Sequence, residues 1–116
     1  MSNTFVVKLP VIGKPTMEPF NEENSYKQIS EAVGGMIEAA LIPEPLIEDP
    51  NCLIDCFVNE EGLLEGLPIN QRLTALCTKS YGGLLVDDAI FVGHDAEGET
   101  VGLPEAVAKA IIGLFD

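Results

Sequence analysis

Three residues of this chain have the side-chain types of a nucleophile, a base and an orienting acid: Cys77, His94 and Asp95. A thiol that an imidazole activates, with a carboxylate holding the imidazole in place, can perform hydrolase or transferase chemistry. The spacing matches no catalytic signature, and His94 and Asp95 follow Gly93 at a predicted turn, where polar side chains are ordinary. We therefore predict no catalytic residue, and the sequence leaves open whether the three side chains meet in space.

The other two cysteines are Cys52 and Cys56, four residues apart in a predicted strand, so both side chains point to the face shared with Ile54. Tetrahedral zinc requires two further ligands, and His94 with the distant Cys77 does not complete a recognisable set. We predict that these thiols pack in the core, with no metal site and no cofactor. An odd number of cysteines without a secretory signal also indicates free thiols in the cytoplasm.

Asp55 is a carboxylate inside an otherwise apolar strand, on the side shared by Leu53 and Phe57. A buried carboxylate needs a partner, for which Arg72 and Lys79 are candidates. A position at a strand edge or on an open face is the alternative, and it is the one we favour.

One turn pattern occurs twice, as Gly-Leu-Leu-Glu-Gly-Leu-Pro over residues 62–68 and Gly-Glu-Thr-Val-Gly-Leu-Pro over residues 98–104. Each copy predicts a strand, a tight turn that needs the positive φ of glycine, a short return strand and a Leu-Pro step into a helix. We predict that the first glycines of the two copies, Gly62 and Gly98, occupy corresponding positions with positive φ.

The two Gly-Leu-Pro steps allow a second interpretation, because amides at a helix N-terminus attract anions. A phosphate or nucleotide pocket is therefore an alternative to a purely structural turn. Neither copy has the longer glycine pattern of a phosphate loop, and Glu65 and Glu105 place negative charge nearby. Turn geometry alone explains these glycines.

The first half of the chain predicts a strand at Thr4–Leu9, with Met17–Phe20 pairing back onto it. A helix begins at Asn24 or Ser25, whose oxygen can cap the first free amides. Its apolar periodicity would continue beyond residue 35, but Gly34-Gly35 is typical of a helix C-terminus. We predict that residues 36–42 form a strand, with a longer helix as the alternative.

The second half predicts two buried strands, Cys52–Val58 and Leu84–Gly93, because both runs are almost continuously apolar. Asn70–Cys77 is expected to be a short helix with Leu73 and Leu76 inward. Pro104 opens a terminal helix with one apolar face, formed by Val107, Ala110, Ile111 and Leu114. The pattern predicts a single α+β domain over residues 1–116, with a small, mostly antiparallel sheet, two hairpins and about three short helices.

Several sequence blocks resemble those of the DUF3846 family, whose members are small domains of unknown function. The blocks are Val33–Glu38, Asn59–Gly62 with Gly66–Asn70, and Ile90–Gly93 before the second Glu-Gly turn. They stand in the family's order and cover most of the chain from Tyr26 onward. Such domains occur in bacteria and in phage and plasmid genomes, so the resemblance implies an accessory role in a mobile element. It implies no activity.

Nineteen acidic residues against six basic ones give a net charge of −13. Direct binding to nucleic acid is disfavoured, because no lysine or arginine cluster is present to neutralise phosphates. No apolar run approaches the ~20 residues of a membrane span. A solvated surface is the simplest account of the acidity, and mimicry of nucleic acid is the alternative.

These observations favour a cytoplasmic, non-enzymatic binding module of a phage or mobile element. The expected partner is a protein with a basic surface, bound through a face bordering the acidic, proline-rich segment Pro43–Pro50. The apolar segment Tyr81–Leu85 would also suggest a protein contact if it is exposed. A small-ligand or nucleotide-binding protein is the second interpretation, and a small hydrolase or transferase is the third.

Overall fold

The computed structural model describes residues 3–40, 42–43, 46–47, 53–61, 66–77 and 85–115. Within these residues a seven-stranded sheet has the main order β2-β1-β5-β4-β3, and every pair of neighbours is antiparallel. The elements along the chain are β1 (Thr4–Leu9), β2 (Thr16–Pro19), α1 (Ser25–Val33), β3 (Ile37–Ala40), β4 (Leu53–Asn59), α2 (Gln71–Cys77), β5 (Ala89–His94), β6 (Thr100–Val101), β7 (Leu103–Pro104) and α3 (Glu105–Leu114). The α+β class and the mostly antiparallel sheet are as predicted.

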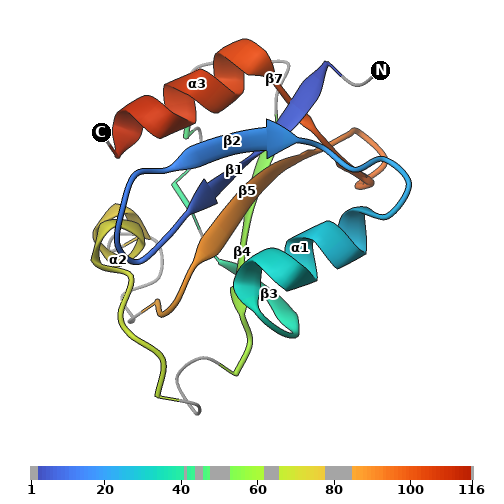
Figure 1. The fold of residues 1–116 in the computed structure, drawn as a ribbon. Helices are drawn as coiled ribbons and strands as arrows, with labels where there is room; N and C mark the ends of the chain where they lie inside the picture. Colours follow the sequence, from blue (N-terminus) through green and yellow to red (C-terminus); the bar gives the residue numbers. More distant parts are fainter. Residues whose placement is uncertain are drawn as a thin grey trace.

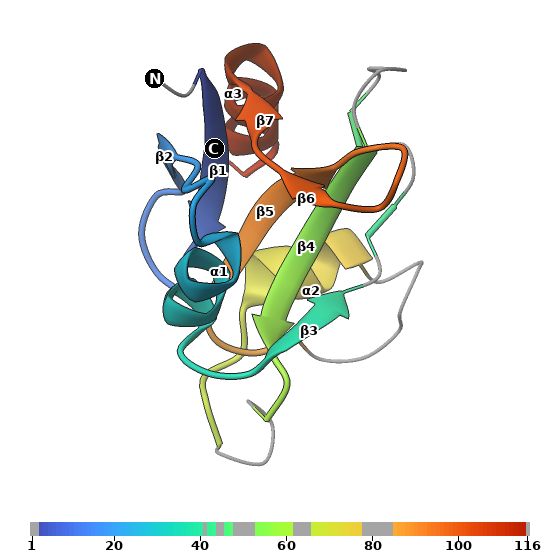
Figure 2. The ribbon, with the colours of Figure 1, turned by 90° about the vertical axis from the view of Figure 1, so that its right-hand side faces the viewer.

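The sheet separates two layers of helices, with α1 on one face and α2 and α3 on the other (Figures 1 and 2). Alternate side chains of the central strand β5 point to opposite faces of the sheet. Ile90 and Val92 pack with α1, whereas Phe91 packs with α2 and α3. A strand covered on both faces has no solvent side, which explains its continuous apolar run. No helix in the described part of the chain is long and apolar enough to cross a membrane.

Helix α1 begins and ends as its sequence predicts. The Asn24 side chain accepts a hydrogen bond from the Lys27 amide at 3.1 Å, which makes Asn24 the N-cap. Gly34 ends the helix with φ of 79°, a conformation that favours glycine. The chain then enters β3, so the strand interpretation of this region is confirmed over Ile37–Ala40 and the longer helix is wrong.

Strand β5 is shorter than the sequence predicts. It begins at Ala89, because Asp87 has φ of 63° and Val86 makes only an isolated bridge with Ile69. Residue 84, the expected start of the strand, lies outside the described residues, as does the rest of the Tyr81–Leu85 segment before Leu85.

The buried face of α3 also differs from the prediction. Val107 and Ile111 are buried as expected, but Ala110 is exposed and Leu114 is 47% exposed, and Ala108 is buried in their place. The stripe is rotated because the chain enters α3 directly from β7, which pairs with β1. That pairing, and not the hydropathy of α3 alone, decides which side of the helix meets the sheet.

The two copies of the turn pattern are not structural equivalents. Gly98 has φ of 83°, as predicted, whereas Gly62 lies outside the described residues. At the second glycine the copies differ. Gly66 has φ of 70°, and no described atom beyond its chain neighbours lies within 4 Å of the place a Cβ would take, whereas Gly102 is packed against the side chains of Thr4 and Phe20. Glycine is therefore required for different reasons at the two positions: at Gly66 for the positive φ, and at Gly102 because a side chain has no space.

Candidate functional site

The best-defined pair of chemically active side chains lies on the same sheet face as α1. His94 Nδ1 is 3.0 Å from Asp55 Oδ2, and the two side chains are 26% and 32% exposed. The register places His94 of β5 opposite Leu53 of β4, so the pair is diagonal across the two strands. A carboxylate at this distance orients the imidazole and leaves Nε2 as the nitrogen that can face another group.

This pair replaces the partners that the sequence suggested for Asp55. Arg72 Nη2 instead donates a hydrogen bond to the Pro10 carbonyl at 2.7 Å, and Lys79 lies outside the described residues. Asp55 is only partly buried, which agrees with the favoured position on a partly open face.

The sequence candidates for a catalytic triad do not come together. Cys77 is fully buried in the core on the α2 and α3 side of the sheet, whereas His94 lies on the α1 side. The Asp95 carboxylate accepts hydrogen bonds from the Glu97 and Glu99 amides at 3.0 and 2.9 Å, so it stabilises the hairpin turn. The two described cysteines, Cys56 and Cys77, thus both lie in the core on the opposite side of the sheet from the imidazole.

The buried thiols are held in their unreactive form. Burial, with smaller effects of Cys77 and Asp55, raises the pKa of the Cys56 thiol well above its ordinary value, and burial raises the pKa of Cys77. A protonated thiol is a poor nucleophile and a poor metal ligand. Cys56 packs in the core as predicted, and Cys52 lies outside the described residues. Among the described side chains, no group of three His, Cys, Asp or Glu residues is placed to hold a metal ion.

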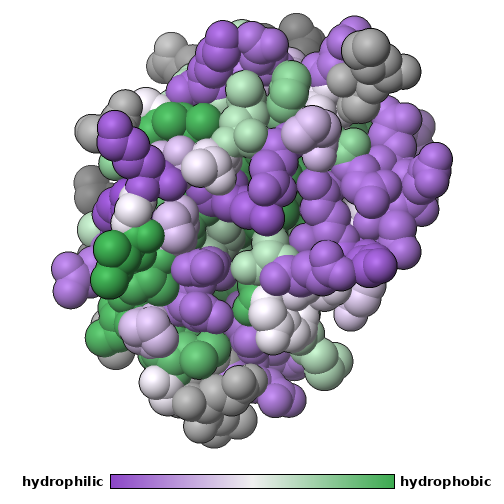
Figure 3. Space-filling model, in the orientation of Figure 1, coloured by the Kyte–Doolittle hydropathy of each residue, from purple (hydrophilic) through white to green (hydrophobic). Residues whose placement is uncertain are grey.

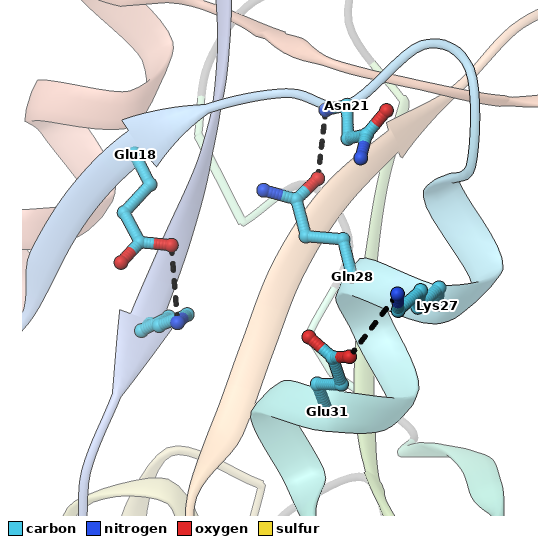
Figure 4. A pocket seen from close by; sticks show the side chains of 6 residues that line it. Glu18, Asn21, Lys27, Gln28 and Glu31 are labelled. Atoms are coloured by element: carbon cyan, nitrogen blue, oxygen red, sulfur yellow. Dashed lines mark hydrogen bonds and ion pairs between the residues drawn. The ribbon is translucent and has the colours of Figure 1, made fainter.

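A polar cleft of about 360 Å³ lies between the β1–β2 hairpin and α1 (Figure 4). Its charged side chains pair with one another, Lys8 with Glu18 at 3.0 Å and Lys27 with Glu31 at 3.9 Å. Gln28 Oε1 accepts from the Asn21 amide at 2.8 Å. Because these groups already have partners, an anionic or cationic ligand would have to displace an internal ion pair.

A second hollow, of about 470 Å³, lies next to the first along α1 and shares Glu31 with it. Tyr26 and Met36 line it and are both 59% exposed, and Gly34 and Gly35 form part of its surface. Tyrosine and methionine are enriched in protein interfaces, whereas a large exposed apolar side chain is unfavourable in water.

Most of the described positive charges are compensated within the molecule. Lys8, Lys27 and Lys109 pair with glutamates, and Arg72 binds a backbone carbonyl. Exposed acids occur in the loop before α1 and in the β5–β6 hairpin, on the strongly hydrophilic side of the molecule in Figure 3. The excess of negative charge is thus presented to solvent.

Two buried asparagines join segments that are distant in the sequence. Asn70 is fully buried; its Nδ2 donates to the Leu9 and Asp87 carbonyls, at 3.1 and 3.0 Å, and its Oδ1 accepts from the Leu73 amide. It therefore caps α2 and joins that helix to β1. Asn59 joins the end of β4 to the end of α1, because its Nδ2 donates to the Val33 carbonyl at 3.2 Å.

A family model for a domain of unknown function, DUF3846, matches residues 6–116. The chain belongs to this family. The match confirms the resemblance and extends it over nearly the whole chain. No curated protein and no solved structure matches the chain.

The DUF3846 blocks of this chain contain mainly architectural residues. Gly34 ends α1, and Asn59 and Asn70 are the two buried hydrogen-bonding side chains described above. The sequence did not predict the hydrogen bonds of either asparagine. Each asparagine stands between an apolar run and a turn or helix start, which is a typical place for a capping side chain. Its hydrogen-bond partners, however, are distant in the sequence, so the local pattern does not identify them.

Proposed function

We propose that this DUF3846 protein is a non-enzymatic binding module whose partner is a protein with a basic surface. The observation that supports the proposal is the charge distribution: the described lysines and arginine are largely paired internally, in a chain of net charge −13. Such a molecule attracts positively charged surfaces over a Debye length of about 8 Å at physiological ionic strength.

The hollow beside α1 supplies an anchor for such a partner. Tyr26 and Met36 offer exposed apolar area, and Glu38, two residues after Met36, adds an exposed negative charge. An apolar centre with a charged rim is the usual organisation of a protein interface. Along the chain, Met36 is followed by β3 and then by residues 42–43, where the Pro43–Pro50 segment begins.

The other two functions have weaker support. A nucleotide or other charged ligand in the polar cleft competes with the internal pairs of Lys8 and Lys27. A cysteine hydrolase is disfavoured because Cys77 and His94 lie on opposite faces of the sheet. The proposal also includes a phage or mobile-element context, which the family resemblance supports. It includes a cytoplasmic location, which the odd number of cysteines supports.

The test begins with affinity purification from the native host and mass spectrometry, which identifies the partner. The association rate of the purified pair is then measured at increasing salt concentration, for the natural chain and for a variant in which Glu44, Glu48 and Asp49 are neutralised together. We expect salt and the triple substitution each to slow association, with a nearly unchanged melting temperature. Neutralising Glu97 and Glu99, on the β5–β6 hairpin, removes two charges instead of three and should slow association less for each charge removed.

Two results would contradict the proposal. If the association rate depends on neither salt nor the triple substitution, the partner is not selected by charge. If the purified protein shows a turnover that His94→Ala abolishes, the protein is an enzyme.

A further inference from the structure

The two outer strands of the main sheet, β2 and β3, differ in how their free edges are protected. Strand β3 pairs with β4 on one side, and no strand in the described part of the chain pairs with its other side. The Glu60 amide donates to the Met36 carbonyl at 2.8 Å, which makes Met36 and Glu60 a hydrogen-bonded pair of the ladder. Such pairs alternate along antiparallel strands.

The alternation decides which backbone groups of β3 point away from β4. With Ile37 opposite Asn59 and Ala39 opposite Phe57, these two residues of β3 occupy the non-hydrogen-bonded positions. Their N–H and C=O groups therefore face outward, where an additional strand would bind them. Ala39 is exposed, so its side chain does not obstruct an incoming backbone.

Strand β2, at the opposite edge, shows what a protected edge looks like in this chain. The Phe20 amide donates to the Thr4 carbonyl at 3.0 Å, which places Pro19 at an outward-facing position. Proline has no N–H to offer there, and the Pro19 carbonyl already accepts a hydrogen bond from Gln28 Nε2 at 2.9 Å. Proline on an edge strand is a recognised defence against unwanted pairing. Strand β3 contains no proline.

The charge around β3 determines what kind of strand the edge can accept. Glu38 projects from β3 and is exposed, and Glu60 and Glu61 lie at the adjoining end of β4. A second copy of this chain would bring another net charge of −13 to the same edge. The surroundings therefore favour a positively charged segment over a homodimer.

We propose that the outer edge of β3 binds an extended, lysine- or arginine-containing segment of a partner protein by adding it to the sheet as a strand. The inference rests on the proposed function for the charge of the partner, and it adds the mode of binding. Main-chain hydrogen bonds to Ile37 and Ala39 supply affinity, and Glu38 selects for positive side chains.

The experiment uses a fluorescent peptide of alternating lysine and valine with blocked ends, and a matched peptide with glutamate in place of lysine. Binding is measured by anisotropy to the natural chain and to Ala39→Pro. This substitution removes an outward N–H but no hydrogen bond to β4, so the protein should still fold. Its affinity for the lysine peptide should fall about tenfold or more. Glu38→Pro is the matched control for folding, because it removes a ladder hydrogen bond and should lower the melting temperature.

Amide hydrogen exchange is a second measurement, and it distinguishes strand addition from binding by charge attraction alone. On addition of the lysine peptide, the amides of Ile37 and Ala39 should become protected, whereas those of Glu38 and Ala40 are already protected by β4. The glutamate peptide should bind at least about tenfold more weakly than the lysine peptide. If Ala39→Pro does not fold, peptides N-methylated at alternate residues test the same hydrogen bonds on the natural chain.

Several outcomes would overturn the inference. Equal binding to folded Ala39→Pro, equal binding of methylated and unmethylated peptides, or no binding of the lysine peptide at low salt excludes strand addition at β3. If the Ile37 and Ala39 amides become more protected from exchange as the protein concentration rises, without peptide, the strand that binds the β3 edge is from a second copy of the chain. The proposed function is tested separately by the association rate with the native partner. If that rate depends on salt, the proposed function holds even when strand addition is excluded. If that rate does not depend on salt, the proposed function is wrong whatever the peptides show.

Discussion

At the scale of single residues, the Asn70 side chain joins α2 to the end of β1 and to the turn before β5. Replacing Asn70 with alanine leaves the Leu9 and Asp87 carbonyls without this donor and removes the cap of α2. We expect a loss of about 2–4 kcal/mol of unfolding free energy, the sum of a lost cap and of buried acceptors left unsatisfied. Chemical denaturation measures it.

Asn24→Ala is the control for Asn70→Ala, because Asn24 caps α1 from an exposed position. It should lose only about 1 kcal/mol. Asn70→Asp keeps an acceptor for Leu73 but turns a carboxylate toward two carbonyl oxygens, so it should be no better than alanine. Equal stability losses for Asn24→Ala and Asn70→Ala would show that the buried network contributes little.

The two buried thiols predict a pH dependence of stability. Because the pKa of Cys56 and that of Cys77 are raised in the folded state, the folded chain keeps thiol protons that the unfolded chain releases. The unfolded state then binds fewer protons, so this contribution is fully present below the unfolded thiol pKa of about 8.5 and is lost as pH rises above it.

We therefore expect the urea midpoint to fall between about pH 8 and pH 10. In a Cys56→Ala/Cys77→Ala variant the fall should be smaller, which separates the thiols from lysine and tyrosine titration. Native mass spectrometry should in addition show neither bound zinc nor a disulfide. A parallel fall in both proteins, or stoichiometric metal, contradicts this view of the cysteines.

At the scale of elements, three glycines in the C-terminal third should respond differently to alanine. Gly98→Ala forces a side chain into φ of 83° and should destabilise by about 1 kcal/mol or more. Gly102→Ala should be worse, because the new Cβ would lie 2.7 Å from Phe20 Cβ and would overlap the Thr4 side chain. Gly113→Ala, inside α3, should raise the unfolding free energy by about 0.5–1 kcal/mol, because no described atom beyond its chain neighbours and the helix backbone lies within 4 Å of the added Cβ.

Thermal melts of the three single variants decide these expectations. The ranking tests the conclusion that the second turn pattern holds a strained turn and a close contact in succession. A Gly102→Ala protein as stable as the natural chain would mean that β7 does not pack against β1 as described.

At the scale of the whole molecule, the net charge of −13 should make stability depend on salt. At about 0.01 M ionic strength the Debye length is about 30 Å, close to the 38 Å longest dimension of the described structure. All the acids then repel one another, whereas at about 0.15 M only near neighbours do. We expect the melting temperature to rise by several degrees over this range.

A variant with Glu97 and Glu99 reversed to lysine provides the control for the salt effect. Both residues are exposed on the β5–β6 hairpin, so the reversal reduces the repulsion without changing the core. Its melting temperature should be higher at low salt and should rise less as salt is added. The same salt response in both proteins would mean that general ion effects, rather than repulsion, are responsible.

Local sequence determined most of the elements and their ends. The alternation and apolar runs of β1, β4 and β5 follow from short-range periodicity, and the ends of α1 follow from Asn24 and Gly34. These features depend on residues within about one helical turn of each other, so they can be recognised without knowing the fold. The acidic character of the surface likewise follows from composition.

Only the tertiary structure decided which residues meet. His94 pairs with Asp55 because the β4–β5 register sets them on one diagonal, and Cys77 is separated from both by the sheet. The strand order likewise leaves one edge of β3 without a partner strand among the described residues. Register and strand order arise from pairing between distant segments, and the free energy of that pairing is shared over many contacts. No short stretch of sequence carries that information.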